Sequence, residues 1–487
     1  MSDIEVAVSR VLAAVPKQLF VDGTWRDAAG GRTFEVVDPA TELTLCQVAD
    51  ASPGDALAAL GVAAAAQARW ASTAPRERGE LLRRAFEAVT AARDDLALLL
   101  TLEQGKPLSE AAAEVDYAAE FFRWFAEEAV RVDGGYRRSP DGRTRLLTMR
   151  QPVGPCLFVT PWNLPLAMGT RKIGPALAAG CTVVIKPAEQ TPLSVLALVA
   201  ILVDCGLPPG VVNVVTSSDP AGVTNPLLAD PRLRKLSFTG STAVGRVLLA
   251  RAADQVLRVS MELGGNAPFL VFGDADIEAA VDGAMIAKMR FTGQACTAAN
   301  RFLVDNRVVD AFAEQLTERM AACVIGRGTE PGITVGPLID AAAVEKVQSL
   351  VDDAVAKGAR MLLGGKALPG PGHFYPPTVL ADVPNSARIL VEEVFGPVAP
   401  IRSFVYDAQA LAEANATEFG LVAYAYTADL DRAVRVAEGL EAGMIGINRG
   451  LVSNPAAPFG GVKQSGLGRE GGFEGITEFL ETKYVAL

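Results

Sequence analysis

The chain has 487 residues and half of them are hydrophobic, which is enough for two to four structural units rather than one core. Its 45 basic and 56 acidic residues leave a formal net charge of −11. Such a charge argues against broad binding to nucleic acid or to anionic membranes, although a local basic pocket is compatible with it.

The six cysteines are scattered and show neither a C-x-x-C pair nor a zinc-ligand spacing. We therefore expect no metal site, no disulfide framework and a reducing compartment, the cytoplasm. Residues 1–20 mix acidic and basic side chains without a long apolar stretch, so no signal peptide is expected. The best apolar run, residues 193–203, is too short to span a bilayer.

The first third of the chain predicts several helices. Residues 53–130 are rich in Ala, Leu and Glu at helical spacing, and Ser52-Pro53 is a typical helix start. Two turn signals follow, at 132–136 and 139–142, on either side of a polar and basic segment. This segment predicts an exposed hairpin or arm.

From residue 153 short apolar runs alternate with helical stretches. The expected strands cover 156–160, 181–185, 211–215 and 233–238, and the expected helices cover about 167–179, 192–205 and 242–253. This alternation predicts a parallel sheet with helices on both faces. After residue 262 a second region rich in strands and helices runs to about 450, before a Gly-rich tail and a strand-like end.

Polar groups at the ends of these strands are candidates for binding a nucleotide, because ligands of parallel sheets bind at the carboxyl ends. Gly240-Ser241 opens a helix, and a helix N-terminus binds phosphate through free N–H groups. Simple capping by Ser241 is the alternative. Lys186 and Glu189 are placed to bind ribose hydroxyls, the alternative being a solvated loop pair. A glutamate there repels a 2′-phosphate and favours NAD over NADP.

Cys296 is the candidate nucleophile. A thiol needs a base or a positive environment to attack, but the single histidine, His373, lies in a turn-rich stretch. Glu262, between an apolar strand and Gly264-Gly265, is the candidate base because burial raises the pKa of a carboxyl group. The alternatives are a structural cysteine and a glutamate in a salt bridge.

Taken together, these segments resemble the aldehyde dehydrogenase superfamily. The resemblance runs from about Leu19 to the C-terminus. It is carried, in this order, by Pro161-Trp162-Asn163, the stretch 186–192, Phe238-Thr239-Gly240-Ser241, Glu262-Leu263-Gly264-Gly265, Gly293-Gln294-Ala295-Cys296 and Glu392-Glu393-Val394-Phe395-Gly396-Pro397.

The resemblance implies an α/β fold in three parts. A Rossmann-type nucleotide-binding domain is expected at 1–129 and 150–260, and an α/β catalytic domain at 261–450. A small β oligomerisation arm is expected at 130–149 and 470–487, which implies a homodimer or homotetramer.

The resemblance also implies a role for each matched residue. Cys296 is the expected nucleophile, Glu262 the general base that activates water, and Asn163 an oxyanion donor together with the Cys296 N–H. The residues expected to bind NAD or NADP are Trp162, Lys186, Glu189, Gly240, Ser241, Leu263, Glu393 and Phe395. This mechanism needs neither histidine nor metal.

Two stretches, 170–181 and 459–471, resemble the succinate-semialdehyde dehydrogenase subgroup. Arg171 and Arg290 match arginines that hold the substrate carboxylate there, and Ser453 lies in a loop expected beside it. Pairing of both arginines with acidic neighbours is the alternative. Glutarate semialdehyde or another ω-oxo acid is the competing substrate, and acyl transfer to CoA or a non-catalytic reuse of the fold are the competing functions.

Overall fold

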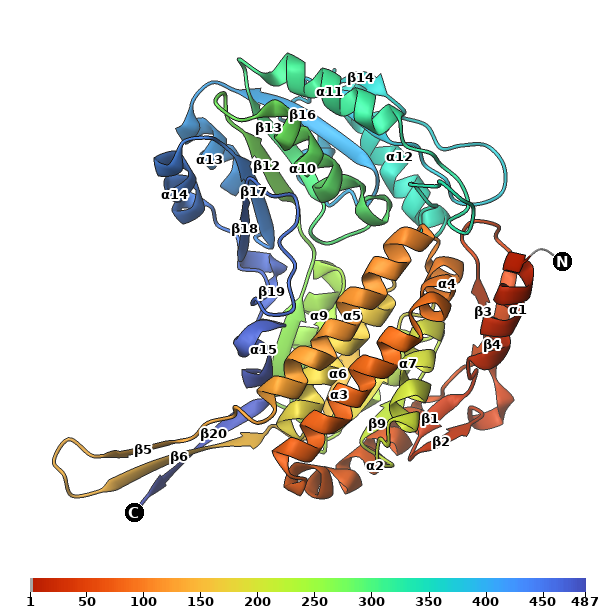
Figure 1. Cartoon of the computed structure of the whole chain (residues 1–487), viewed down its shortest axis with the longest axis vertical. Helices are drawn as coiled ribbons and strands as arrows, with labels where there is room; N and C mark the ends of the chain where they lie inside the picture. Colours follow the sequence, from red (N-terminus) through yellow and green to blue (C-terminus); the bar gives the residue numbers. More distant parts are fainter. Residues whose placement is uncertain (1–2) are drawn as a thin grey trace.

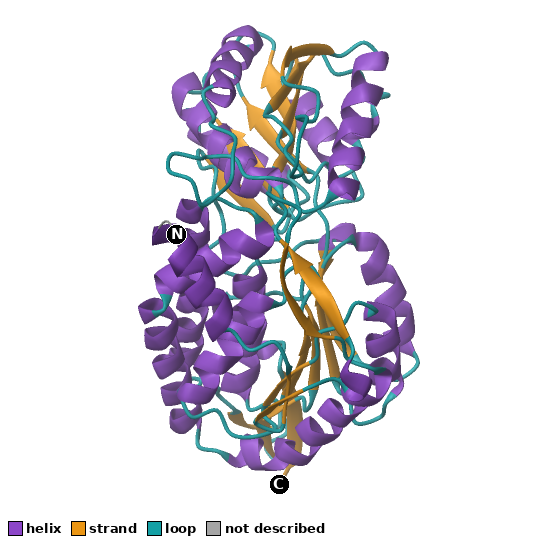
Figure 2. Ribbon diagram, turned by 90° about the vertical axis from the view of Figure 1, so that its right-hand side faces the viewer, coloured by secondary structure: helices purple, strands orange, loops and turns teal. Residues whose placement is uncertain are grey.

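The computed structural model describes residues 3–487. Its strands form two large sheets, a three-stranded sheet that projects from the body as an arm, and a two-stranded ribbon (Figure 1). The two large sheets lie in separate lobes, one above the other (Figure 2). We call the lobe with the eight-stranded sheet the lower lobe and the lobe with the seven-stranded sheet the upper lobe.

The sheet of the lower lobe has the strand order β19-β11-β10-β7-β8-β9-β1-β2. Strands β7 to β11 pair in parallel, whereas β1, β2 and β19 are antiparallel to their neighbours. The bounds are β1 Leu19–Val21, β2 Thr24–Arg26, β7 Cys156–Val159, β8 Val183–Lys186, β9 Val212–Val214, β10 Lys235–Thr239, β11 Arg258–Glu262 and β19 Gly466–Leu467.

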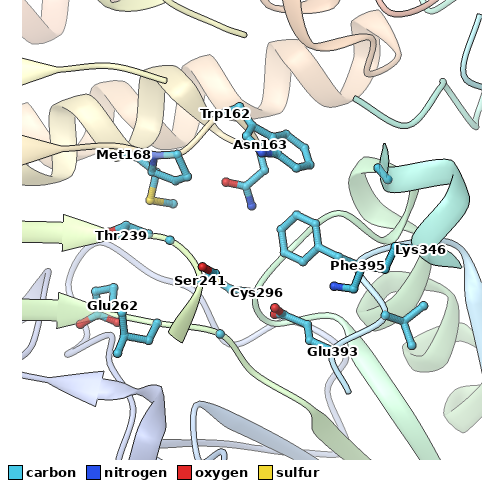
Figure 3. Close-up of a pocket in the computed structure, with 16 residues that line it drawn as sticks. Trp162, Asn163, Met168, Thr239, Ser241, Glu262, Cys296, Lys346, Glu393 and Phe395 are labelled. Carbon is cyan, nitrogen blue, oxygen red and sulfur yellow. The ribbon is translucent and has the colours of Figure 1, made fainter. Parts of the chain in front are cut away.

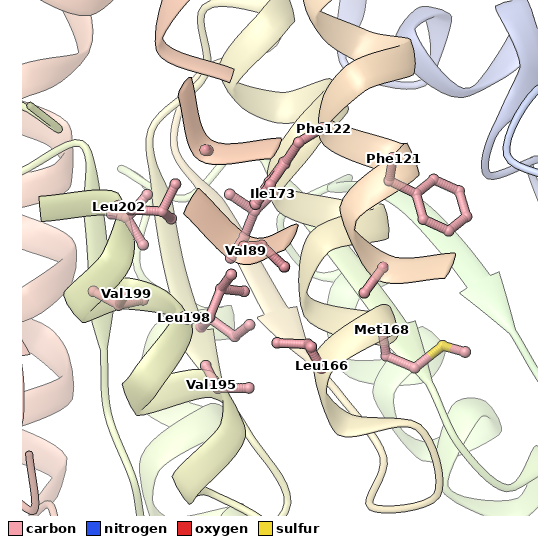
Figure 4. Packing of buried hydrophobic residues seen from close by; sticks show 14 of the residues in the cluster. Val89, Phe121, Phe122, Leu166, Met168, Ile173, Val195, Leu198, Val199 and Leu202 are labelled. Atoms are coloured by element: carbon pink, nitrogen blue, oxygen red, sulfur yellow. The ribbon is translucent and has the colours of Figure 1, made fainter. Parts of the chain in front are cut away.

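Helices cover both faces of this sheet. Ser52 caps the second of them through a reciprocal capping box with Asp55, which explains why the helix begins there. Val89, Phe122, Ile173 and Leu198 come from four different helices and are buried against one another (Figure 4). The bounds are α1 Asp3–Ala14, α2 Pro53–Ser72, α3 Pro75–Ala91, α4 Arg93–Gln104, α5 Leu108–Glu128, α6 Pro165–Ala179, α7 Leu193–Asp204, α8 Pro220–Ala229 and α9 Thr242–Ala253.

The sheet of the upper lobe has the order β14-β15-β16-β13-β12-β17-β18, and only β14 is antiparallel to its neighbour. Its strands are β12 Ala267–Val271, β13 Ala299–Asp305, β14 Arg360–Leu363, β15 Thr378–Ala381, β16 Val398–Phe404, β17 Val422–Tyr426 and β18 Met444–Ile447. Its helices are α10 Ile277–Met289, α11 Val309–Ala321, α12 Ala341–Ala356, α13 Asp407–Asn415 and α14 Leu430–Gly439.

The arm joins two distant parts of the chain. β5 (Gly135–Arg138) and β6 (Arg145–Pro152) form a hairpin, and β20 (Leu480–Ala486) pairs with β6 along its whole length (Figure 1). α15 (Gly472–Thr477) leads into β20. The ribbon consists of β3 (Thr33–Val37) and β4 (Thr44–Ala49), and 3-10 turns lie at Ala29–Gly31, Arg290–Gly293, Arg388–Leu390 and Lys463–Ser465.

The α/β fold expected from the sequence is confirmed, and the strands and helices predicted between 153 and 253 lie within a few residues of their observed bounds. The pattern did not reveal β19, which has two residues and returns to the edge of the lower sheet beside Glu262. Gly466 lies there at φ 141°, and a Cβ on it would stand 1.9 Å from the carbonyl oxygen of Met261. Only glycine permits this pairing.

Candidate active site

The site lies where the chain passes between the two lobes. β11 ends at Glu262 in the lower lobe, and β12 begins at Ala267 in the upper lobe. Cys296 follows a turn in which Phe291, Thr292 and Gly293 all have positive φ. A Cβ on Gly293 would stand 2.3 Å from the carbonyl oxygen of Gly396, so the turn needs glycine at this position.

Two cavities meet at Cys296 and share Met168. The first, of about 220 Å³, we call the strand-end cavity. It is lined by Trp162, Asn163, Thr239, Gly240, Ser241, Glu262, Leu263, Lys346, Glu393 and Phe395 among others (Figure 3). The second, of about 240 Å³, we call the arginine cavity; its lining includes Tyr117, Arg171, Arg290, Ser453 and Phe459.

The strand-end cavity has the features of a nucleotide site. Ser241 caps α9 and accepts from the Val244 N–H at 3.4 Å, so the start of this helix faces the cavity. Gly245 lets α9 pack on Leu263, because a Cβ there would stand 2.5 Å from that side chain. Both the phosphate role and the simpler capping role are compatible with Ser241.

The far end of the strand-end cavity carries the residues expected beside the nicotinamide. Glu393 accepts from the Gly265 N–H at 3.0 Å, and burial raises the pKa of its carboxyl group. The Trp162 and Phe395 rings lie edge to face with centroids 5.4 Å apart. An apolar ring and an acceptor for hydroxyl groups thus line the same cavity as the thiol, which suits a nicotinamide riboside.

Lys186 and Glu189 lie at the end of β8, outside the lining of the strand-end cavity. Their side chains form an ion pair at 2.9 Å, in which the lysine is buried and the glutamate is 38% exposed. Lys186 and Glu189 therefore form the ion pair that was the alternative to ribose binding. The exposed carboxylate of Glu189 is nevertheless accessible to a ribose.

Asn163 lines the strand-end cavity together with Cys296 (Figure 3). Its Nδ2 donates to the carbonyl oxygen of Gln294 at 2.9 Å, and its Oδ1 is buried without a partner. The side-chain amide is thereby tied to the loop that carries Cys296. A neutral donor thus lines the same cavity as the thiol, which is compatible with an oxyanion site.

The surroundings of Cys296 disfavour the charged form of its thiol. Burial raises its pKa to about 12, and the positive charge of Arg171 offsets only part of that effect. An additional positive charge in the strand-end cavity would lower this pKa.

Glu262 is buried, and neither carboxylate oxygen has a hydrogen-bond partner. Burial, followed by the charge of Glu470, raises its pKa well above the ordinary range. The carboxylate lies away from Cys296 (Figure 3), and Oε1 is 3.0 Å from where a Cβ on Gly460 would stand. Glu262 therefore forms no salt bridge with the residues that the structure describes, contrary to the alternative of a salt-bridged glutamate.

The arginine cavity holds unpaired positive charge. Arg171 pairs through Nε with Glu470 and stacks on the Phe459 ring at 4.0 Å, which leaves its buried Nη2 without a partner. Arg290 lies 4.9 Å from the Phe291 ring and has no ion pair within residues 3–487. The alternative that both arginines pair with acidic neighbours thus holds only for the Nε of Arg171 and does not hold for Arg290. A buried donor without a partner is costly, so the cavity fits an anionic ligand.

Sequence patterns did not single out Tyr117, Lys346, Phe459 or Glu470 as site residues. Phe459 and Glu470 lie near the two ends of the Gly-rich tail that carries the subgroup resemblance. Their position in that stretch is the sequence feature that could have identified them as site residues. Tyr117 and Lys346 sit in ordinary helical stretches of α5 and α12 and gave none.

Within the described part of the chain, no group of three or more His, Cys, Asp or Glu side chains is arranged to hold a metal ion. The six cysteines are all unpaired. No helix among residues 3–487 has the length and hydropathy needed to cross a bilayer.

A cysteine beside a nucleotide-like cavity, with a buried carboxyl group at the end of the connecting strand, is the arrangement expected of a nucleotide-linked dehydrogenase that works through a covalent intermediate. The family model described as the aldehyde dehydrogenase family matches residues 25–485, and the chain belongs to that family.

Named relatives span nearly the whole chain. A succinate-semialdehyde dehydrogenase of Paenarthrobacter nicotinovorans is 57% identical over 91% of this chain and 98% of its own length. An NADP(+)-type succinate-semialdehyde dehydrogenase of Escherichia coli (strain K12) is 49% identical over 97% and 98%. A glutarate-semialdehyde dehydrogenase of Pseudomonas putida is 50% identical over 97% and 98%.

A solved structure shows the same architecture with a cofactor bound. It is the betaine aldehyde dehydrogenase of Staphylococcus aureus in complex with NAD+, which superposes with a TM-score of 0.96 at 33% identity and covers 99% of this chain and 97% of that one.

Proposed function

We propose that this enzyme oxidises succinate semialdehyde to succinate with NAD. One observation supports this substrate above all: the arginine cavity opens on Cys296 and holds Arg290 and the Nη2 of Arg171 without acidic partners. An aldehyde that carries a carboxylate a few carbons away can place that group on the arginines and its carbonyl carbon at the thiol.

In the first half of the reaction Cys296 attacks the aldehyde carbon as a thiolate and forms a thiohemiacetal. The Asn163 Nδ2 and the Cys296 N–H are the donors we assign to the resulting oxyanion, and loss of one such donor typically costs about 3–4 kcal/mol. A nicotinamide cofactor would be held by the residues of the strand-end cavity and would supply an acceptor for the hydride that leaves the thiohemiacetal carbon. With that hydride gone, Cys296 carries the acyl group as a thioester.

In the second half Glu262 takes a proton from a water that attacks the thioester, which frees the acid and the thiol. Because its carboxylate lies away from Cys296, the side chain must turn toward the thioester for this step. It must also lose its proton, and its raised pKa makes the active base form more abundant as pH rises.

Replacement of Arg290 by glutamine should reduce kcat/KM for succinate semialdehyde about 10- to 100-fold, since a hydrogen bond to a charged group is worth roughly 1.5–3 kcal/mol. Butanal, which has the same carbon number and no carboxylate, is the matched control and should be affected less than about twofold. Arg171→Lys, which keeps the positive charge and removes the free Nη2, should likewise lower kcat/KM for succinate semialdehyde more than for butanal. Equal losses for both aldehydes would contradict a carboxylate anchor.

The exposed carboxylate of Glu189 supports a preference for NAD, since it repels the 2′-phosphate of NADP. Glu189→Ser should raise the ratio of kcat/KM for NADP to that for NAD by about 10-fold or more, which corresponds to roughly 1.4 kcal/mol. Glu318→Ser, on the upper lobe, is the control for loss of a surface charge. An unchanged ratio would assign the cofactor preference to other residues.

Glutarate semialdehyde is the second candidate substrate, supported by the relative from Pseudomonas putida. One methylene changes binding by only about 1–3 kcal/mol, so the kcat/KM values for the C4 and C5 semialdehydes decide between them. Acyl transfer to CoA competes with hydrolysis; the buried, unpartnered Glu262 supports hydrolysis, and mass spectrometry of the product would reveal an acyl-CoA.

We further propose a cytoplasmic homodimer or homotetramer. Six unpaired cysteines support a reducing compartment. The arm supports an assembly of subunits, because β5 is exposed along its whole length. Tyr136 of β5 and Tyr484 of β20 are also largely exposed.

A further inference from the structure

Lys106 is a fully buried lysine between the two loops that carry the proposed reacting groups. It lies in the short turn between α4 and α5, and its side chain has no exposed surface. Its ammonium group pairs with Glu114 and donates to the backbone carbonyl of Asn163 at 2.7 Å. The same group lies 4.5 Å above the Phe291 ring.

Glu114 extends this contact to the other side of the Asn163 segment. While one carboxylate oxygen holds Lys106, the other accepts from the N–H groups of Leu166 and Ala167 at 3.1 and 3.2 Å, at the start of α6. The segment between β7 and α6 is thus held before and after Leu164 by a single ion pair. The backbone carbonyl of Asn163 is therefore fixed in direction, and the Cα from which the side chain starts is held in place with it.

The same part of α5 also holds the loop of the nucleophile. Glu110 accepts from the Phe291 N–H at 2.8 Å, next to the ring over which Lys106 lies. Across the gap, the Asn163 Nδ2 binds the carbonyl oxygen of Gln294. Neither Asn163 nor Cys296 lies in a strand or a helix, so contacts of this kind set the distance between them.

Stability alone does not require this ion pair. Removing two charges from water is costly, and replacing a buried pair by apolar groups of similar volume is often neutral or stabilising. What an apolar side chain would not do is orient a backbone carbonyl. The pair is therefore better explained by placement of the Asn163 segment than by its contribution to the free energy of unfolding.

We propose that Lys106 is a positioning residue for the oxyanion site: it holds the Asn163 amide at the distance from Cys296 at which it meets the alkoxide. This rests on the proposed function, since it assumes that Asn163 is the oxyanion donor. Lys106 touches neither substrate nor cofactor in this proposal.

The test is the double variant Lys106→Met with Glu114→Gln, which removes both charges of the ion pair together and retains the acceptor for α6. The burst of NADH formation in the first turnover should slow about 10- to 100-fold, because an oxyanion donor displaced by a fraction of an ångström loses most of its effect. The dissociation constant for NAD should stay within about twofold. The control is Lys235→Met, which removes another buried lysine. Lys235 begins β10, at the end of the strand away from Thr239, and donates to Ser260 of β11.

A double-mutant cycle with Asn163→Ala separates positioning from structure. In the Asn163→Ala background the loss of Lys106 should slow the burst less than about twofold, since the donor that Lys106 orients is gone. The proposal would be overturned if the losses in burst rate from Asn163→Ala and from the loss of Lys106 were fully additive. It would also be overturned if the burst slowed only in proportion to a lower Tm and Lys235→Met showed the same relation. If the double variant does not fold, the same cycle is measured with Lys106→Arg, which keeps the charge and moves the donor. Its effect on the burst should again be less than about twofold in the Asn163→Ala background.

Failure of the proposed function would look different. An unmodified enzyme that reduces no NAD with any semialdehyde refutes the reaction itself. An active enzyme whose burst is unaltered by Asn163→Ala refutes the oxyanion role, and an active enzyme with an additive cycle refutes only the role of Lys106.

Discussion

Replacement of Cys296 by alanine is expected to lower kcat/KM for every aldehyde on the order of 10⁴-fold or more, because no other group can form the covalent intermediate. The measurement is aldehyde-dependent NADH formation by absorbance, with binding of NAD measured separately to show that the strand-end cavity is intact. Cys323→Ala, at a half-buried cysteine after α11, is the matched control and should keep full activity. Turnover in Cys296→Ala at more than a few per cent of the normal rate would remove Cys296 from the mechanism.

Replacement of Glu262 by glutamine is expected to stop the reaction at the thioester. The first turnover should still release one equivalent of NADH per active site, while steady-state turnover falls about 10²- to 10⁴-fold, the usual contribution of a general base. Stopped-flow absorbance separates the two phases, and Cys296→Ala, which should show neither, calibrates the baseline. A variant without a burst would place Glu262 in the first half of the reaction instead.

The pH profile adds an independent check on Glu262. Burial raises its pKa, so the carboxyl group is mostly protonated below that value and the steady-state rate should climb as pH rises toward it. The rise should be absent from the steady-state rate of Glu262→Gln, because glutamine does not titrate. A profile that is the same in both proteins would show that another group limits the rate.

Much of the site could be predicted from the sequence because its residues follow strand ends and glycine turns. Cys296, Asn163 and Glu262 each lie beside a local signal, and the structure brings all three to one cavity. Glu470 could not be placed in the same way. Its partner Arg171 lies 299 positions away, and no local pattern encodes such a contact. Lys106 could not be predicted for the same reason, since its proposed role depends on a carbonyl 57 positions further along the chain.

The atomic detail of the arginine cavity was also beyond sequence reasoning. A pattern can place Arg171 near an anion, but it cannot tell which nitrogen Glu470 occupies and which is free. That difference decides whether the arginine is neutralised within the fold or still able to receive a ligand.

The Gly-rich tail has a consequence for how such an enzyme can change over time. Phe459 and Glu470 shape the arginine cavity, and the same stretch continues through α15 into β20 of the arm. One run of fewer than thirty residues thus serves both the arginine cavity and the projecting sheet. An insertion or shift in this run alters both at once, so the cavity and the arm cannot change as separate modules.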